Sequence, residues 1–113
     1  MQDNYFHAVF ESVKGVSDRL RILSDQTSDG AELVSLIFSV KNPILKINNL
    51  SKESEISEQK GFLNLLIGLF GAIRNLVAHE YRINWIMSEQ DALDIFSMIS
   101  YVHIKLDLEK KFD

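Results

Sequence analysis

The sequence predicts an all-α fold, a bundle of four or five helices forming a single domain over residues 1–113. Apolar residues recur at steps of three and four over long stretches, which is the period of a buried helical face. The strict alternation that is typical of strands is nearly absent. The sequence contains no internal repeat, low-complexity tract or linker, and 113 residues suffice for one core but not for two.

The amino-acid composition and the net charge exclude several classes of protein. The chain is 46% hydrophobic and 25% charged, as in ordinary globular domains. It has no cysteine, which excludes disulfides and thiolate metal sites and suits a reducing compartment. Without a long apolar run or a signal peptide, we expect a cytoplasmic protein with no membrane partner. A net charge of −4 and a pI near 5.3 disfavour broad nucleic-acid binding, so any RNA contact is expected to be local or built from two chains.

The first helix is predicted over residues 3–23. Its apolar stripe is formed by Tyr5, Val9, Val13, Val16, Leu20 and Leu23, widened by Phe6 and Phe10. Gly15 lies within the helix, where it weakens the helix by about 1 kcal/mol relative to Ala. We therefore expect Gly15 to mark a close approach of another helix.

A polar, turn-forming run over residues 24–30 precedes the second helix. Asp29 is expected to cap this helix, with Glu32 as its reciprocal partner. The helix is short, it ends because of Pro43, and its apolar face is predicted to consist of Leu33, Leu36, Ile37 and Val40. Residues 44–47 could form a strand, but we favour an extended segment packed on the bundle.

The central helix is predicted to be capped by Ser57, with Glu58 in its first turn. Its apolar face consists of Phe62, Leu65, Leu66, Leu69, Phe70 and Ile73. Gly61, Gly68 and Gly71 also fall in this helix, although each costs about 1 kcal/mol of helix stability. Two interpretations stay open, namely tight packing inside the bundle and a helix crossing at a dimer seam.

Residues 82–87 are expected to connect to the last helix, which starts at Ser88 with Asp91 in the capping-box position. Its predicted core face consists of Ala92, Leu93, Ile95, Phe96, Ile99, Val102 and Leu106. We expect Lys110 and Lys111 at the C-terminus of this helix, where cations complement its dipole.

Three polar residues, Arg74, Asn75 and His79, stand out at the end of the central helix. Asn75 and His79 share a face, whereas Arg74 and His79 are about 140° apart on an ideal helix. A His that exchanges protons near neutral pH, with an Arg that holds phosphate oxygens, suits attack of a ribose 2′-hydroxyl on the adjacent phosphate. The spacing alone favours structural roles for these residues, with Arg74 in a salt bridge, Asn75 capping a helix end and His79 hydrogen-bonded at the rim of the bundle.

The sequence gives little support for a metal site, a serine nucleophile or a phosphate-binding loop. His7, His79 and His103 are scattered without a His-x-x-x-His pair, so we expect no metal site. The sequence has no nucleophile elbow and no glycine-rich phosphate loop after a strand. We therefore expect no cofactor.

The segment over residues 74–79 resembles the Arg-x4-His motif, with Asn after the Arg, of HEPN domains, an all-α family that includes many RNase toxins. The chain is similar to the Ymh-type family of that clan over nearly its whole length. This similarity is carried by Tyr5, Ala8, Val9, Glu11, Val13 and Lys14, by Asp29-Gly30, Leu33 and Phe38, by residues 57–62 and 71–79, and by Asp91-Ala92. Leu76 stands where Ymh-type sequences usually carry Pro, so the helix is expected to run on more regularly there.

The resemblance implies a homodimer in which two Arg-x4-His motifs share one composite cleft. Arg74 and His79 would be catalytic and Asn75 would assist. The implied reaction is metal-independent RNA cleavage that leaves a 2′,3′-cyclic phosphate, performed by a toxin or phage-defence effector. A second class stays open, a non-catalytic HEPN module that binds a nucleotide, RNA or protein partner, such as a larger defence assembly.

Tyr81 completes an Arg-x4-His-x-Tyr form seen in HEPN toxins whose tyrosine is nucleotidylated by a partner antitoxin. The alternative is an aromatic side chain at a helix end that packs with Trp85, and we favour this alternative.

Overall fold

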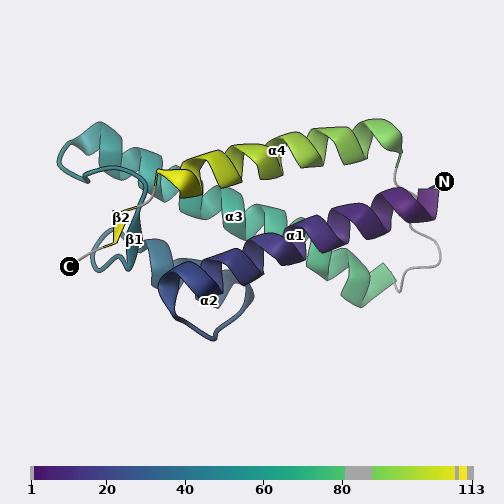
Figure 1. The fold of residues 1–113 in the computed structure, drawn as a ribbon, viewed down its shortest axis with the longest axis horizontal. Coiled ribbons are helices and arrows are strands. Elements are labelled where there is room, and N and C mark those ends of the chain that lie inside the picture. Colours follow the sequence, from purple (N-terminus) through teal and green to yellow (C-terminus); the bar gives the residue numbers. More distant parts are fainter. Residues whose placement is uncertain (1, 81–87, 109, 112–113) are drawn as a thin grey trace.

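The computed structural model describes residues 2–80, 88–108 and 110–111, with side chains over 5–73 and 88–108, and it confirms the all-α bundle (Figure 1). The helices of these ranges are, in chain order, α1 (Gln2–Ser24), α2 (Gly30–Phe38), α3 (Glu53–Glu80) and α4 (Glu89–Asp107). Two short strands complete the described part, β1 (Leu45–Lys46) and β2 (Lys110–Lys111).

Helix α1 organises the bundle, because it contacts each of the other three helices. Helix α4 packs along α1 and runs in the same direction, whereas α3 runs back the opposite way with α2 packed against it (Figure 1). The start of α1, the end of α3 and the start of α4 therefore lie at one end of the molecule, and the strands lie at the other.

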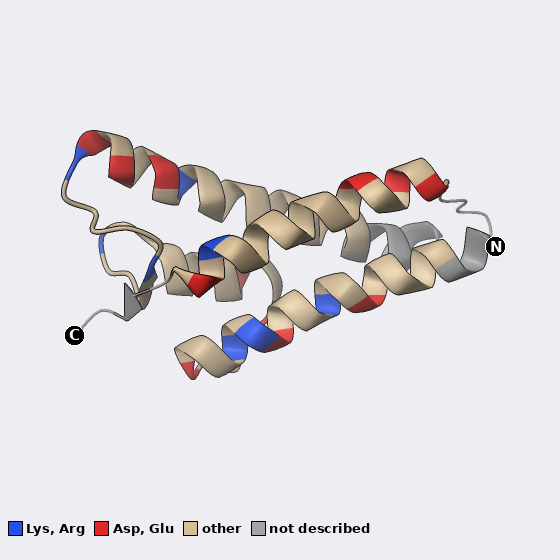
Figure 2. Cartoon of the chain, turned by 45° about the horizontal axis from the view of Figure 1, so that its top comes forward, with Lys and Arg blue, Asp and Glu red and all other residues tan. Residues whose placement is uncertain are grey.

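The core joins all four helices and β1 into one cluster. Helix α1 contributes its predicted apolar stripe to this core, in which Val9, Val13, Val16 and Leu20 are at most 1% exposed. The buried polar side chains of the described ranges are Ser17, Ser24 and Gln59, and charged residues lie on the outer sides of the helices (Figure 2). The α1 stripe was thus predicted correctly.

Three sequence predictions about packing are wrong. Leu36 and Leu93 were assigned to apolar core faces but are 41% and 51% exposed. Leu36 lies outside the buried face of α2, because this helix buries the adjacent pairs Leu33–Val34 and Ile37–Phe38. A Cβ added at Gly15 would meet nothing within 4 Å, so no helix approaches closely there.

Helix α2 starts as predicted and ends earlier. The Asp29 carboxylate accepts a hydrogen bond from the Gly30 backbone N–H at 2.8 Å and so caps the helix. The helix stops at Phe38, before Val40 and well before Pro43. Its end is set by the returning chain, since the Ile44 backbone N–H donates to the Ile37 carbonyl at 2.8 Å.

The predicted start of α3 at Ser57 is wrong, because the helix begins at Glu53. The Glu55 carboxylate accepts hydrogen bonds from the Ser51 backbone N–H at 2.9 Å, the Ser51 hydroxyl at 2.8 Å and the Lys52 backbone N–H at 3.2 Å. These bonds satisfy donors that have no partner within the helix and lower the pKa of Glu55. By contrast, the predicted cap of α4 is confirmed, because the Ser88 hydroxyl accepts from the Asp91 backbone N–H at 3.0 Å.

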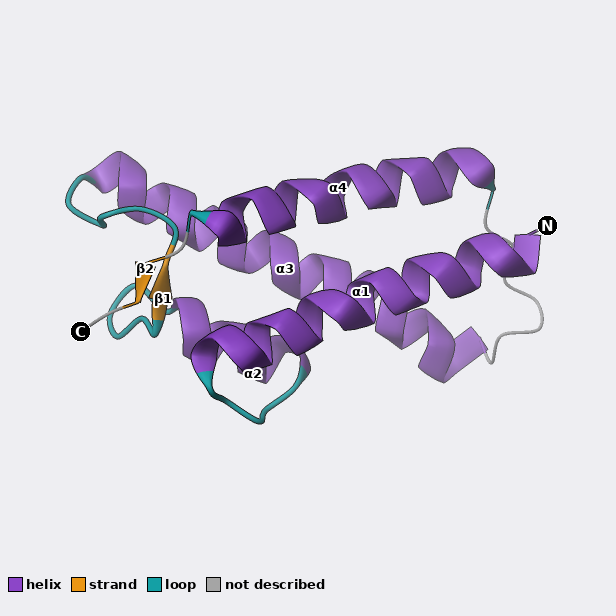
Figure 3. Cartoon of the chain, in the orientation of Figure 1, coloured by secondary structure: helices purple, strands orange, loops and turns teal. Residues whose placement is uncertain are grey.

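The extended segment after α2 forms a strand, which corrects the interpretation favoured from the sequence. Leu45 pairs with Lys111 and Lys46 with Lys110 in an antiparallel pair (Figure 3). Lys110 and Lys111 therefore do not sit at the end of α4, which stops at Asp107. A pairing of two residues between distant parts of the chain has no local periodicity, so the sequence pattern could not reveal it.

Gln59 makes the polar contacts that join α3 to the end of α2 and to β1. Its side chain is 0% exposed, and its amide oxygen accepts from the Ile47 backbone N–H at 3.0 Å. Its amide nitrogen donates to the backbone carbonyls of Leu45 at 3.0 Å and Phe38 at 3.3 Å. One side chain thus satisfies three buried backbone groups that lie outside regular helix bonding.

An ion pair ties the C-terminal part of α4 to the first turns of α3. Lys105 Nζ donates to Glu58 at 2.9 Å, and Asn48 donates to the other Glu58 oxygen at 2.8 Å. The hydrogen bond from Lys105 and then that from Asn48 lower the pKa of Glu58, and the Glu58 bond raises the pKa of Lys105. The Glu58 side chain is 41% exposed, so solvent screens this pair considerably.

We expect Gln59→Leu to lower the free energy of unfolding by about 3 kcal/mol, because it leaves three buried backbone groups without a partner. Urea denaturation followed by circular dichroism measures this change. The matched control is Gln90→Leu on the exposed surface of α4, which should stay within about 0.5 kcal/mol of the wild type. Equal losses in the two variants would contradict the role given to Gln59.

We expect the Glu58 ion pair to make stability pH-dependent on the acid side. Its lowered pKa means that the stabilisation is present above the ordinary value of 4.5 and is lost as the pH falls through the folded-state value. Glu58→Gln should therefore unfold at a melting temperature that falls less between neutral and acid pH. Glu53→Gln, an exposed change in the same helix, should keep the wild-type pH dependence, and identical slopes in all three proteins would reject the assignment.

Candidate functional site

The residues of the Arg-x4-His motif lie in the last two turns of α3, which reaches Glu80. The side chains of Arg74, Asn75 and His79 lie outside the described residues. Tyr81 lies entirely outside them, and so do the proposed Tyr81–Trp85 contact and the predicted connection over 82–87.

The α3 backbone stays helical through the motif, as expected from Leu76 in place of Pro. On an unbroken helix, five residues separate positions 74 and 79 by about 140° around the axis. Positions 75 and 79 share one face. A single α3 helix thus presents the Arg and His positions toward different sides.

A groove between α3 and α4 opens beside the last turns of α3. It has a volume of about 350 Å³ and is lined almost entirely by apolar atoms. Its walls are Asn64, Leu65, Gly68, Leu69, Ala72 and Ile73 of α3 with Ile95 and Met98 of α4. Its described lining reaches Ile73, directly before Arg74, so the described wall of the groove leads along α3 up to the motif.

Gly61 and Gly68 of α3 do not serve tight packing within the protomer. A Cβ added at Gly61 or Gly68 would meet nothing within 4 Å. The interpretation of these two glycines as close contacts inside the bundle is therefore wrong. Because Gly68 lines the groove, its open side faces the surface on which another molecule could come close.

The exposed apolar surface of α4 was missed by the sequence analysis. Leu93, Met98, Tyr101, Ile104 and Leu108 are between 39% and 57% exposed. The spacing of Leu93, Ile104 and Leu108 places them on one side of the helix, away from the core stripe of Ile99, Val102 and Leu106. A second apolar stripe on α4 was thus the available signal.

At the end of the molecule where the motif lies, the described charged residues of α4 are acidic. Glu89, Asp91 and Asp94 are exposed near its start, which lies at the same end as the last turns of α3 (Figures 1 and 2). Carboxylates repel the phosphates of nucleic acid. The described start of α4 therefore offers acidic groups and no cation to a phosphate.

The other two histidines lie on α1 and α4. His7 is exposed on α1, and His103 Nδ1 lies 2.9 Å from an Arg19 guanidinium nitrogen. Arg19 also binds Asp107 at 2.6 Å, so this cluster joins α1 to α4. Across the ranges that the structure describes, no three His, Asp or Glu side chains are grouped to hold a metal ion.

Comparison with known proteins gives one match. A family model described as "Protein of unknown function (Hypoth_ymh)" matches residues 1–106. No curated protein matches the chain, and no solved structure matches it. Within the described residues, no helix has the length and apolar character needed to cross a membrane.

Proposed function

The chain belongs to the Hypoth_Ymh family, and we propose that it is a metal-independent endoribonuclease of HEPN type that acts as a homodimer. The observation that carries the proposal is the Arg-x4-His motif with Asn75, on a helix that continues to Glu80 beside an open apolar groove. The resemblance to HEPN toxins suggests a toxin or phage-defence role, with an antitoxin or a larger assembly as further partner.

The regular course of α3 supports a composite site. Positions 74 and 79 of one helix point about 140° apart, so one chain does not direct both toward one phosphate. Two antiparallel copies of α3 that cross between positions 74 and 79 bring the Arg position of one protomer toward the His position of the other. The apolar groove next to the motif supplies surface whose burial would stabilise such a crossing.

The proposed reaction needs one base and one anion-binding group. The His79 imidazole takes the proton of a ribose 2′-hydroxyl, and the 2′-oxygen forms a bond to the adjacent phosphorus. The bond from phosphorus to the 5′-oxygen breaks, and this oxygen takes a proton from solvent. Arg74 stabilises the charge on the phosphate oxygens, Asn75 orients the imidazole, and the products are a 2′,3′-cyclic phosphate and a 5′-hydroxyl.

A second candidate function, a non-catalytic HEPN module, is favoured by the acidic start of α4. Glu89, Asp91 and Asp94 disfavour RNA at the motif end, whereas the apolar groove suits a protein partner. In this case the module would bind through the groove and the motif would have no role in cleavage.

We expect His79→Ala and Arg74→Ala each to lower the rate of RNA cleavage in EDTA at least 100-fold, because each removes a group that acts on the reacting phosphate. Gel analysis of a structured RNA measures the rate, and mass spectrometry identifies the cyclic phosphate ends. The control His103→Gln keeps an acceptor for Arg19 and should cleave as the wild type does. Equal rates in the wild type and His79→Ala would contradict the proposal and favour the binding module.

We expect Gly68→Glu to convert a homodimer into a monomer, because it places a charge in the apolar groove. Sedimentation equilibrium at micromolar concentration measures the mass. Gly15→Glu is the matched control, because Gly15 is also an open helical glycine but lies on α1, outside the groove. A wild-type monomer, or dimers in both variants, would contradict the proposed seam.

A further inference from the structure

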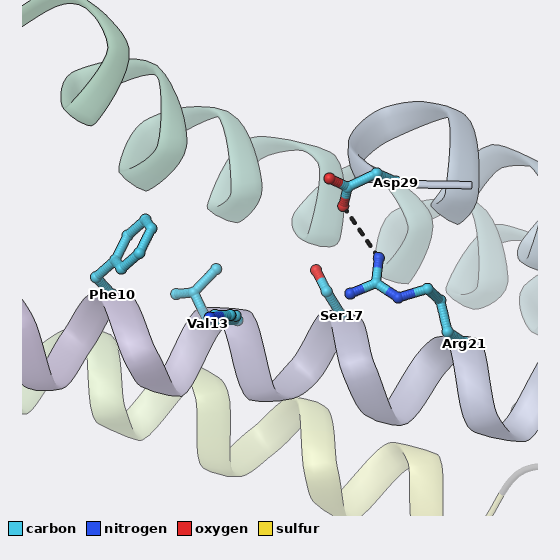
Figure 4. A pocket seen from close by; sticks show the side chains of 6 residues that line it. Phe10, Val13, Ser17, Arg21 and Asp29 are labelled. Carbon is cyan, nitrogen blue, oxygen red and sulfur yellow. Dashed lines mark hydrogen bonds and ion pairs between the residues drawn. The ribbon is translucent and has the colours of Figure 1, made fainter. Parts of the chain in front are cut away.

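A second cavity lies between α1 and the start of α2, distinct from the groove beside the motif. It has a volume of about 190 Å³. Its walls are Phe10, Val13, Lys14, Ser17, Arg21 and Asp29. Figure 4 shows the α1 residues along one side of the cavity, with Asp29 across from Arg21. One end of the cavity is therefore apolar and the other end carries charges.

The Ser17 hydroxyl is buried and has no partner in the described structure. The side chain is only 3% exposed and is directed into the cavity (Figure 4). Ser24 and Ser97, by comparison, donate to the carbonyls four residues before them, at 2.7 and 3.0 Å. Buried hydroxyls are nearly always hydrogen-bonded, so the orientation of Ser17 points to a group that enters the cavity.

The charges around the cavity include one cation, Lys14, that forms no ion pair among the described residues. Arg21 binds Asp18 at 2.7 Å and Asp29 at 3.2 Å, so these three groups neutralise one another in part. Among the described residues, Lys14 has no ion-pair partner, and it stands one helical turn before Ser17. The Lys14 ammonium and the Ser17 hydroxyl are thus the two unpaired groups at the cavity, and both can donate to an anion.

We propose that this cavity binds a small organic monocarboxylate, with its carboxylate on Lys14 and Ser17 and its apolar part on Phe10 and Val13. A dianion such as a phosphate monoester fits less well, because Asp18 and Asp29 lie close to the site. The apolar wall favours an organic ligand over an inorganic anion. The volume corresponds to about six water molecules in the liquid, which suits a single ring or a short branched chain.

The test uses sodium benzoate as the probe and the full chain as the protein. Titration followed by two-dimensional NMR should give saturable shifts of the backbone amides of residues 10–21 in the millimolar range. Benzamide, which has the same shape without the charge, should bind at least tenfold more weakly. Sodium phosphate at equal ionic strength should not displace benzoate.

Two variants and one control test which side chains contact benzoate. Lys14→Met and Ser17→Ala should each weaken benzoate binding about tenfold, and Lys60→Met, an exposed lysine on α3, should leave it unchanged. Because Ser17 has no partner, Ser17→Ala should keep at least the wild-type melting temperature without ligand. Absence of saturable shifts, equal binding of benzamide, or wild-type affinity in both variants would overturn the proposal.

Discussion

The structure depends on the buried amide of Gln59 more than on any other single contact. It binds backbone groups of Phe38, Leu45 and Ile47, which lie at the end of α2 and in and after β1. Phe38 is the last residue of α2 and Ile47 follows β1, so the Gln59 side chain binds the backbone on both sides of the α2–β1 connection. Gln59 therefore fixes where α3 leaves the α2–β1 region, and through that rigid helix it fixes where the motif lies.

Because α3 is long, the position that Gln59 gives to its first turns also determines where its last turns lie, at the other end of the molecule. The helix has 28 residues, which corresponds to about 42 Å at 1.5 Å per residue. Helix α2 has nine residues, so it covers only a part of α3, and α4 packs along α1. The side of α3 between Asn64 and Ile73 is consequently left as an open apolar groove that leads to the motif. The motif and the open groove thus lie next to each other on one helix.

The sequence correctly predicted features that depend on residues close together in the chain. The α1 stripe and the caps at Asp29 and Ser88 are periodic or local features, and all are confirmed. The start of α3 was placed wrongly because Ser57 looks like a cap, whereas Glu55 folds back on Ser51. The role of Gln59 and the pairing of β1 with Lys110–Lys111 depend on contacts far apart in the chain, which no periodicity encodes. The motif of the candidate site could be read from residues 74–79, but the groove beside it required the placement of α4 against α1.

The central claim is that the Arg and His positions of different protomers serve one RNA phosphate, and subunit mixing tests it most directly. Arg74→Ala and His79→Ala proteins carrying different affinity tags are unfolded, refolded together and purified through both tags, and RNA cleavage is then measured in EDTA. The account predicts that each variant alone is inactive and that the mixed dimer regains cleavage, because one intact Arg meets one intact His across the seam. A purified mixed dimer as inactive as its two parents would contradict it.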